Sequence, residues 1–197
     1  MDLGQARDYS AIAILERRVE FTGEVDKVTF ERCTRTRIVV HRLERIPLRT
    51  PYPDVVARVR DLTLNEAYLP NLEIVMDSTG VGAAVRDMLN RAHLQVRVTG
   101  VTITGGERVM LSPGLCHVPR HDLLVNLRVL LEKRMLAVVD TSPHAAAFRE
   151  ELCRWGRRSG HDDLVFAVAL AAWKAGGQQF QIHGSGPLPM LFPEIRK

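Results

Sequence analysis

The sequence lacks any apolar run near the roughly 18 residues that span a bilayer, so we expect no membrane-crossing helix and no membrane partner. Met1 is followed at once by Asp2, and we therefore expect no signal peptide ahead of the fold. The three cysteines are odd in number and show no metal-binding spacing. They indicate reduced thiols and a cytoplasmic protein.

Several motifs of nucleotide and metal chemistry are also absent. The chain has no Gly-x-x-x-x-Gly-Lys-Ser/Thr loop and no dinucleotide fingerprint, which excludes a P-loop ATPase. Its seven histidines are dispersed without the spacing of zinc ligands. No internal repeat is present, which argues against a solenoid.

The composition is that of a globular protein with one sizeable core. The chain has 197 residues, of which 46% are hydrophobic. The formal net charge is +4, which mildly favours a polyanionic partner, although such an excess is often only a solvated surface. Most of the positive charge is arginine, whose planar fork suits phosphate.

Two adjacent carboxylates, Asp162 and Asp163, open an apolar, alanine-rich segment that reaches Trp173. A helix that is apolar nearly all round is buried. An acid in a first helical turn has an ordinary explanation, because the helix N-terminus is partially positive. Two acids at the rim of a core, however, are costly unless they are paired or bind metal.

A second acidic position, Asp77, follows the short buried strand predicted over 72–76. A glycine-containing turn comes next, and a helix is predicted over 83–92. Acids at the carboxyl end of a strand, ahead of such a turn, are common active-site residues in α/β proteins. The alternative is that Asp77 only caps the following helix.

A third acid, Asp2, precedes the strand predicted over 11–15, with an extension over 19–21 and a turn over 22–24. A strand over 36–43 is its expected antiparallel neighbour. Further strands are predicted over 95–103 and 135–139, a hairpin over 108–118, and helices over 54–64, 120–133 and 142–155.

The three acidic positions lie far apart in sequence, each at the end of a predicted element. A cluster of carboxylates holds two hard divalent cations about 3.5–4 Å apart in many phosphodiesterases. Spacing alone leaves open whether these acids converge. Seven cations are candidate DNA contacts, although a solvated face is the usual role of any one: Arg108, Arg120, Arg128, Lys133, Arg134, Arg157 and Arg158.

Five ordered motifs together resemble the nuclease domain of phage large terminase subunits. They are Asp-Leu-Gly-Gln-Ala-Arg-Asp-Tyr-Ser-Ala (2–11), Val-Met-Asp-Ser-Thr-Gly-Val-Gly (75–82), Val-Thr-Ile-Thr-Gly-Gly (101–106), Val-Pro-Arg-His-Asp-Leu-Leu (118–124) and Gly-His-Asp-Asp-Leu-Val-Phe-Ala-Val-Ala-Leu-Ala (160–171). Each motif alone is weak, but their order is specific.

The resemblance implies a ribonuclease H-like α/β fold over residues 1–175, a mixed five-stranded sheet with helices on both faces, and a tail or docking segment over 176–197. It implies metal-dependent endonuclease activity on double-stranded DNA during genome packaging, with a two-ion site for Mg²⁺ or Mn²⁺. The implied catalytic and metal-binding acids are Asp2, Asp77 and one or both of Asp162 and Asp163. Asp8 and His161 rank second, as tuning or positioning residues.

Two departures from the family shape these expectations. The packaging ATPase is missing, so the chain is an excised domain or a stand-alone gene product. The family's first strand has several apolar residues before its Asp, whereas only Met1 precedes Asp2. We therefore expect a truncated first strand, a poorly held Asp2 and an α-amino group that competes with metal.

The implied partners are double-stranded DNA and, in a packaging machine, the ATPase, portal or small terminase subunit. A phage- or prophage-encoded protein would work in the host cytoplasm. Two alternatives stay open: a catalytically weak DNA-binding or docking module, such as a prophage remnant, and a junction-resolvase-like nuclease.

Overall fold

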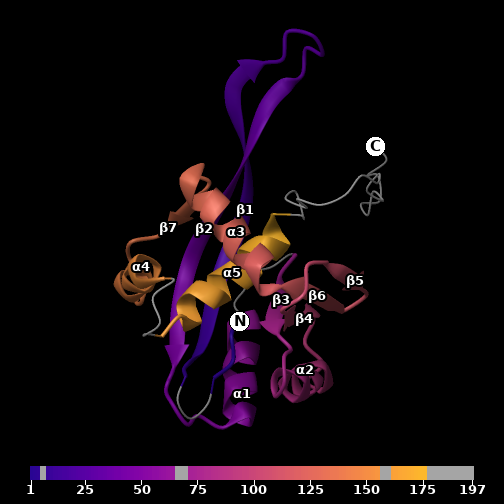
Figure 1. The fold of residues 1–197 in the computed structure, drawn as a ribbon, viewed down its shortest axis with the longest axis vertical. Coiled ribbons are helices and arrows are strands. Elements are labelled where there is room, and N and C mark those ends of the chain that lie inside the picture. Colours follow the sequence, from indigo (N-terminus) through magenta and orange to yellow (C-terminus); the bar gives the residue numbers. More distant parts are fainter. Residues whose placement is uncertain (5–7, 65–70, 156–160, 177–197) are drawn as a thin grey trace.

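The computed structural model describes residues 1–4, 8–64, 71–155 and 161–176, which form an α/β fold with two mixed sheets (Figure 1). The first sheet has three strands in the order β1-β2-β7: β1 (Ser10–Val25), β2 (Arg32–Ile46) and β7 (Leu136–Val138). The second has four in the order β3-β4-β6-β5: β3 (Glu73–Asp77), β4 (Arg97–Thr104), β6 (Leu115–Pro119) and β5 (Met110–Ser112). Strands β1 and β2 are antiparallel, as are β5 and β6, and the other pairings are parallel.

The first two residues connect the two sheets. Asp2 forms an antiparallel bridge with Ala11 of β1. On the other side, the Met1 amino group donates to the Val75 carbonyl at 2.6 Å, and the Asp77 N–H donates to the Met1 carbonyl at 3.0 Å. The expected single five-stranded sheet is therefore replaced by sheets of three and four strands that this short segment joins.

Five helices lie within the described part of the chain: α1 (Tyr52–Thr63), α2 (Gly82–Arg91), α3 (Arg120–Glu132), α4 (Ala145–Arg154) and α5 (Asp163–Ala175). Side chains of β3 alternate between two cores, since Val75 packs with α3, α4 and α5 whereas Ile74 and Met76 pack with α1 and α2. Because successive side chains of a strand point to opposite faces, helices cover both faces, as predicted.

Helix α5 is the central helix of the larger core. Every residue from Asp163 to Leu170 is buried, which confirms the burial expected from its apolar composition. Its neighbour α3 buries Leu123, Leu127 and Leu130, which share one face at helical spacing. The first turn of α5 is thus anchored in the core.

Strands β1 and β2 extend well beyond the body as a hairpin arm (Figure 1). The turn predicted over 22–24 is wrong, because β1 continues to Val25. Gly23 instead lies in a bulge, where the register shifts and its φ is +83°. The Asp26 carboxylate organises the actual turn by accepting the N–H groups of Val28 and Thr29, both at 2.8 Å.

Candidate metal centre

Asp2 is influenced by the charges of the other predicted acids. The pKa of its carboxyl is raised from 3.8 to about 7, mainly by burial and next by the negative charge of Asp77. Asp163 and Asp162 add smaller contributions in the same direction, while the α-amino group opposes them. Carboxylate charges act on one another through space, so the fold brings Asp77, Asp162 and Asp163 within electrostatic range of Asp2.

The α-amino group of Met1 is not a strong competing charge. Burial lowers its pKa from 8.0 to about 6, although Asp2 and Asp77 act in the opposite direction. The amino group is also bound to the Val75 carbonyl. The expectation that Asp2 would be poorly held is corrected, because backbone hydrogen bonds flank it on both sides.

Asp77 ends β3 at a tightly built turn. Its Oδ1 accepts the N–H of Thr79 at 2.8 Å, and the Thr79 hydroxyl oxygen accepts the N–H of Ile103 at 2.9 Å. A Cβ on Gly82 would lie 2.2 Å from the Asp77 carbonyl oxygen, so only glycine lets α2 start so close to β3. The turn therefore holds the Asp77 carboxylate in one orientation.

The adjacent acids at the start of α5 have different surroundings. The Asp163 side chain is only 5% exposed, and its Oδ2 has no hydrogen-bond partner among the described residues. Burial raises its pKa, which His161 lowers. Asp162 is at the surface, where its Oδ2 lies 3.2 Å from Nη2 of Arg120. Arg120 also stacks over the Phe166 ring at 4.1 Å.

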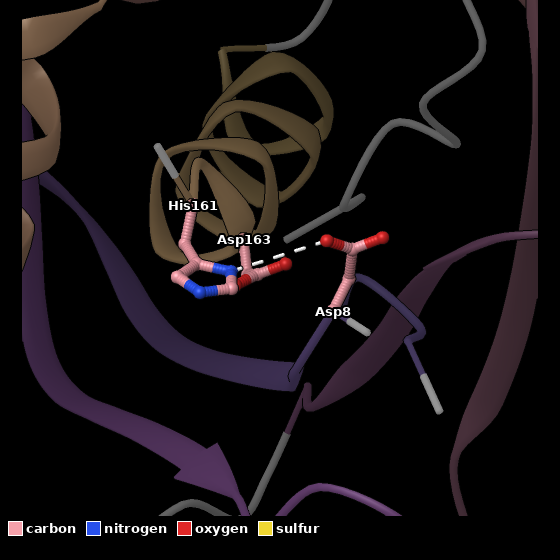
Figure 2. A group of neighbouring side chains, drawn as sticks. All are labelled: Asp8, His161 and Asp163. Carbon is pink, nitrogen blue, oxygen red and sulfur yellow. Dashed lines mark ion pairs between the residues drawn. The ribbon is translucent and has the colours of Figure 1, made fainter. Parts of the chain in front are cut away.

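Asp8 and His161 join Asp163 in a compact group (Figure 2). One ligand atom from each lies within 4.8 Å of the others. His161 Nδ1 is 3.9 Å from Asp8 Oδ1 and 3.7 Å from Asp163 Oδ2. From the resemblance, Asp8 and His161 ranked second, as tuning or positioning residues, and only the fold shows that both face Asp163.

Sequence reasoning missed a buried ion pair behind this group. The Glu151 side chain of α4, 5% exposed, binds Arg45 of β2 and accepts the N–H of Val165 at 3.0 Å. Arg45 in turn stacks over the Tyr9 ring, whose edge meets the His161 ring. Burial raises the pKa of Glu151. No local pattern separates Glu151 from its exposed neighbour Glu150.

Three of these residues, Arg45, Glu151 and His161, also line a small pocket of about 170 Å³. Its lining is Arg45, Ala147, Glu150, Glu151, Arg154 and His161.

The candidate DNA-contacting cations are spread over the molecule. Arg120, at the N-terminus of α3, contacts the acidic group through Asp162. Arg128 pairs with Glu132, and Lys133 and Arg134 follow at the far end of this 13-residue helix, about 20 Å away. Arg108 is exposed between β4 and β5. Arg157 and Arg158, like the tail after Gly176, lie outside the described residues.

Comparison with protein-family models, curated proteins and solved structures finds no match. Within the described residues, every helix is too short or too polar to cross a membrane.

Proposed function

We propose that this protein is a metal-dependent endonuclease that hydrolyses phosphodiester bonds of double-stranded DNA, as the resemblance to terminase nuclease domains implies. The observation that carries the proposal is electrostatic. Asp2, Asp77 and Asp163 come from three distant parts of the chain, yet the charges of Asp77 and Asp163 act directly on Asp2. Groups of acids whose charges perturb one another's pKa values are concentrated at functional sites.

The donor set fits Mg²⁺ or Mn²⁺. Both are hard cations that take carboxylate oxygens, and Asp163 Oδ2 is a buried acceptor without a hydrogen-bond partner among the described residues. Asp2, Asp77 and Asp163 would hold the ions, with Asp162 beside them. Bound there, the ions would supply an activated water and offset the charge that develops on the phosphate.

The protein's own groups then have positioning roles. The turn from Asp77 to Thr79 orients one carboxylate, and the buried α5 orients another. Arg120 lies at the surface beside Asp162, with its side chain 57% exposed. In this proposal its guanidinium would bind a phosphate next to the scissile bond.

The proposal includes a ribonuclease H-like fold. Its support is the strand order β2-β1-(Met1–Asp2)-β3-β4, in which the terminal segment runs antiparallel to β1. The hydrogen bonds of this Met1–Asp2 segment to Val75 and Asp77 have the pattern of a parallel strand pair with β3. Genome packaging in a host cytoplasm, with an ATPase, portal or small terminase subunit as partners, is the matching setting.

A plasmid-nicking assay tests the proposal. Supercoiled plasmid is incubated with the protein and Mg²⁺ or Mn²⁺, with chelator and with Asp77→Asn as controls. Metal-dependent nicking that the variant lacks supports the proposal. Binding of DNA without nicking would favour a docking module, and cleavage confined to four-way junctions would favour a resolvase.

A further inference from the structure

We propose that Asp8, His161 and Asp163 form a separate cation site that prefers first-row transition-metal ions such as Mn²⁺, Co²⁺ or Zn²⁺ over Mg²⁺. It lies beside the all-carboxylate site of Asp2 and Asp77 and shares Asp163 with it. A role of this cation in DNA cleavage rests on the function proposed above, whereas the cation site itself does not.

The geometry is that of a site ready to close on an ion. Figure 2 shows the imidazole edge of His161 facing both carboxylates, with Nδ1 3.9 Å from Asp8 Oδ1 and 3.7 Å from Asp163 Oδ2. Ligand atoms around a bound ion lie about 3 Å apart, given metal–ligand distances of about 2.0–2.2 Å. The side chains of Asp8 and His161 are 74% and 45% exposed, so closing the remaining distance on an ion would need no repacking of the core.

The buried oxygen of Asp163 points independently to a ligand. Its side chain is 5% exposed, and Oδ2 lacks a hydrogen-bond donor within the described ranges. This is the same oxygen that lies 3.7 Å from His161 Nδ1. A buried carboxylate oxygen without a hydrogen bond is costly, and a cation between Oδ2 and Nδ1 would satisfy it.

Packing behind the ring keeps His161 in place. The Tyr9 ring meets it edge-on, with centroids 5.1 Å apart, and the Arg45 guanidinium lies over Tyr9 at 5.1 Å. Arg45 is itself held by Glu151, which also binds the first turn of α5. The same chain of contacts thus orients the imidazole and the helix that carries Asp163, as outer residues do in known metal sites.

The donor atoms decide which ion is preferred. Mg²⁺ takes oxygen ligands and keeps several waters, whereas imidazole nitrogen suits transition ions. Asp8, His161 and Asp163 offer two carboxylates and one nitrogen, while Asp2 and Asp77 offer oxygens alone. The two neighbouring sites therefore differ in preference, and the chain has a reason to carry a histidine at position 161.

The competing explanation is a metal-free ion pair, in which a protonated His161 bridges the two carboxylates. Direct metal binding separates the two. Wild-type protein without DNA is titrated with Co²⁺, followed by visible absorption and calorimetry, and separately with Mg²⁺. The variants are His161→Ala, Asp8→Asn and His161→Asn, all at exposed positions that leave the core untouched.

We expect His161→Ala and Asp8→Asn to weaken Co²⁺ binding by about 10-fold or more, with Mg²⁺ affinity changed much less. His161→Asn places an amide oxygen where Nδ1 was, so it should lose Co²⁺ affinity and keep Mg²⁺ affinity. The matched control is His41→Ala in β2, where the imidazole contacts the carboxylate of Glu16 at 2.7 Å. That variant should bind Co²⁺ like the wild type.

If His161→Ala has the same Co²⁺ spectrum and affinity as the wild type, the proposed cation site is wrong. The metal-free ion pair would then be the explanation of the group. That result would not touch the proposed function, which the nicking assay with Mg²⁺ tests. Conversely, His161-dependent Co²⁺ binding in a protein that never nicks DNA would uphold the cation site and defeat the nuclease proposal.

Discussion

The backbone N–H of Asp77 donates to the carbonyl oxygen of Met1 at 3.0 Å, which sets the end of β3 directly against the first residue of the chain. Asp2 follows Met1 and bridges to β1. A pair of backbone hydrogen bonds on each side of this segment therefore holds Asp2 within electrostatic range of Asp77, whose charge is the largest charge effect on the pKa of Asp2.

Asp77→Asn is expected to reduce cleavage by about 100-fold or more while leaving the fold and DNA affinity nearly unchanged. The amide oxygen still accepts the Thr79 N–H, but the charge that a divalent cation needs is lost. Nicking rates and melting curves give the answer. The control is Asp87→Asn on α2, a carboxylate 61% exposed away from the group. Equal rates in both variants would remove Asp77 from the site.

The metal-free protein is expected to lose stability as the pH rises from about 4 to about 7, because Asp2 has a folded pKa raised from 3.8 to about 7. In that window the native state holds a proton that the unfolded state has released. The Met1 amino group has the opposite effect and increases stability as the pH rises from about 6 to about 8, because folding lowers its pKa from 8.0 to about 6. Urea unfolding over a pH series, with Asp2→Asn for comparison, measures how the free energy of unfolding of each protein changes with pH.

Asp2→Asn should therefore gain stability relative to wild type as the pH approaches 7, and should show a smaller rise in melting temperature when Mg²⁺ is added. A difference between the two proteins that is independent of pH would contradict the raised pKa.

Glu151→Ala is expected to destabilise the fold by about 3–5 kcal/mol, because it leaves Arg45 without its buried partner and removes the acceptor for the Val165 N–H. Denaturant unfolding measures the change. The neighbouring Glu150→Ala breaks only an exposed pair with Arg154 and should stay within about 0.5 kcal/mol. Similar effects of the two variants would show that burial of the pair is unimportant.

DNA binding is expected to be sequence-tolerant and steeply salt-dependent, because phosphate contacts release counterions. Arg120→Ala should weaken binding and lower the slope of log affinity against log salt by about 1. Arg128 lies eight positions further along α3 and pairs with Glu132, so Arg128→Ala should change this slope less. Anisotropy titrations with unrelated duplexes over a salt series test this, and identical slopes for both variants would argue against Arg120 as a contact.

Phe21→Ser and Phe30→Ser are expected to change the free energy of unfolding by less than about 0.5 kcal/mol. Both rings lie on the arm, 67% and 82% exposed. Phe148→Ala, at a fully buried ring, should cost about 3–5 kcal/mol. A large loss in either arm variant would mean that the arm packs against something in solution.

The sequence predicted most elements correctly, because their signals are local. The apolar stretch after Asp163 is a buried helix, and the segment ending at Asp77 is a strand followed by a glycine turn and a helix. The prediction of the turn over 22–24 failed because a glycine can mark either a turn or a β-bulge. Gly23 marks a bulge rather than a turn, because the Asp26 side chain organises the reversal further along the chain.

The sequence by itself determined which residues carry charge at the ends of elements, since periodicity and turn chemistry act over a few residues. Only the tertiary structure decided which charges share a site. Asp163 is buried and Asp162 is not, although nothing local separates them. Asp8 meets His161, and Arg45 meets Glu151 across 106 positions, because α5 packs on β1 and β2 with α4 beside it, which brings distant segments together. Burial and electrostatic interaction depend on distance in space, which no local pattern specifies.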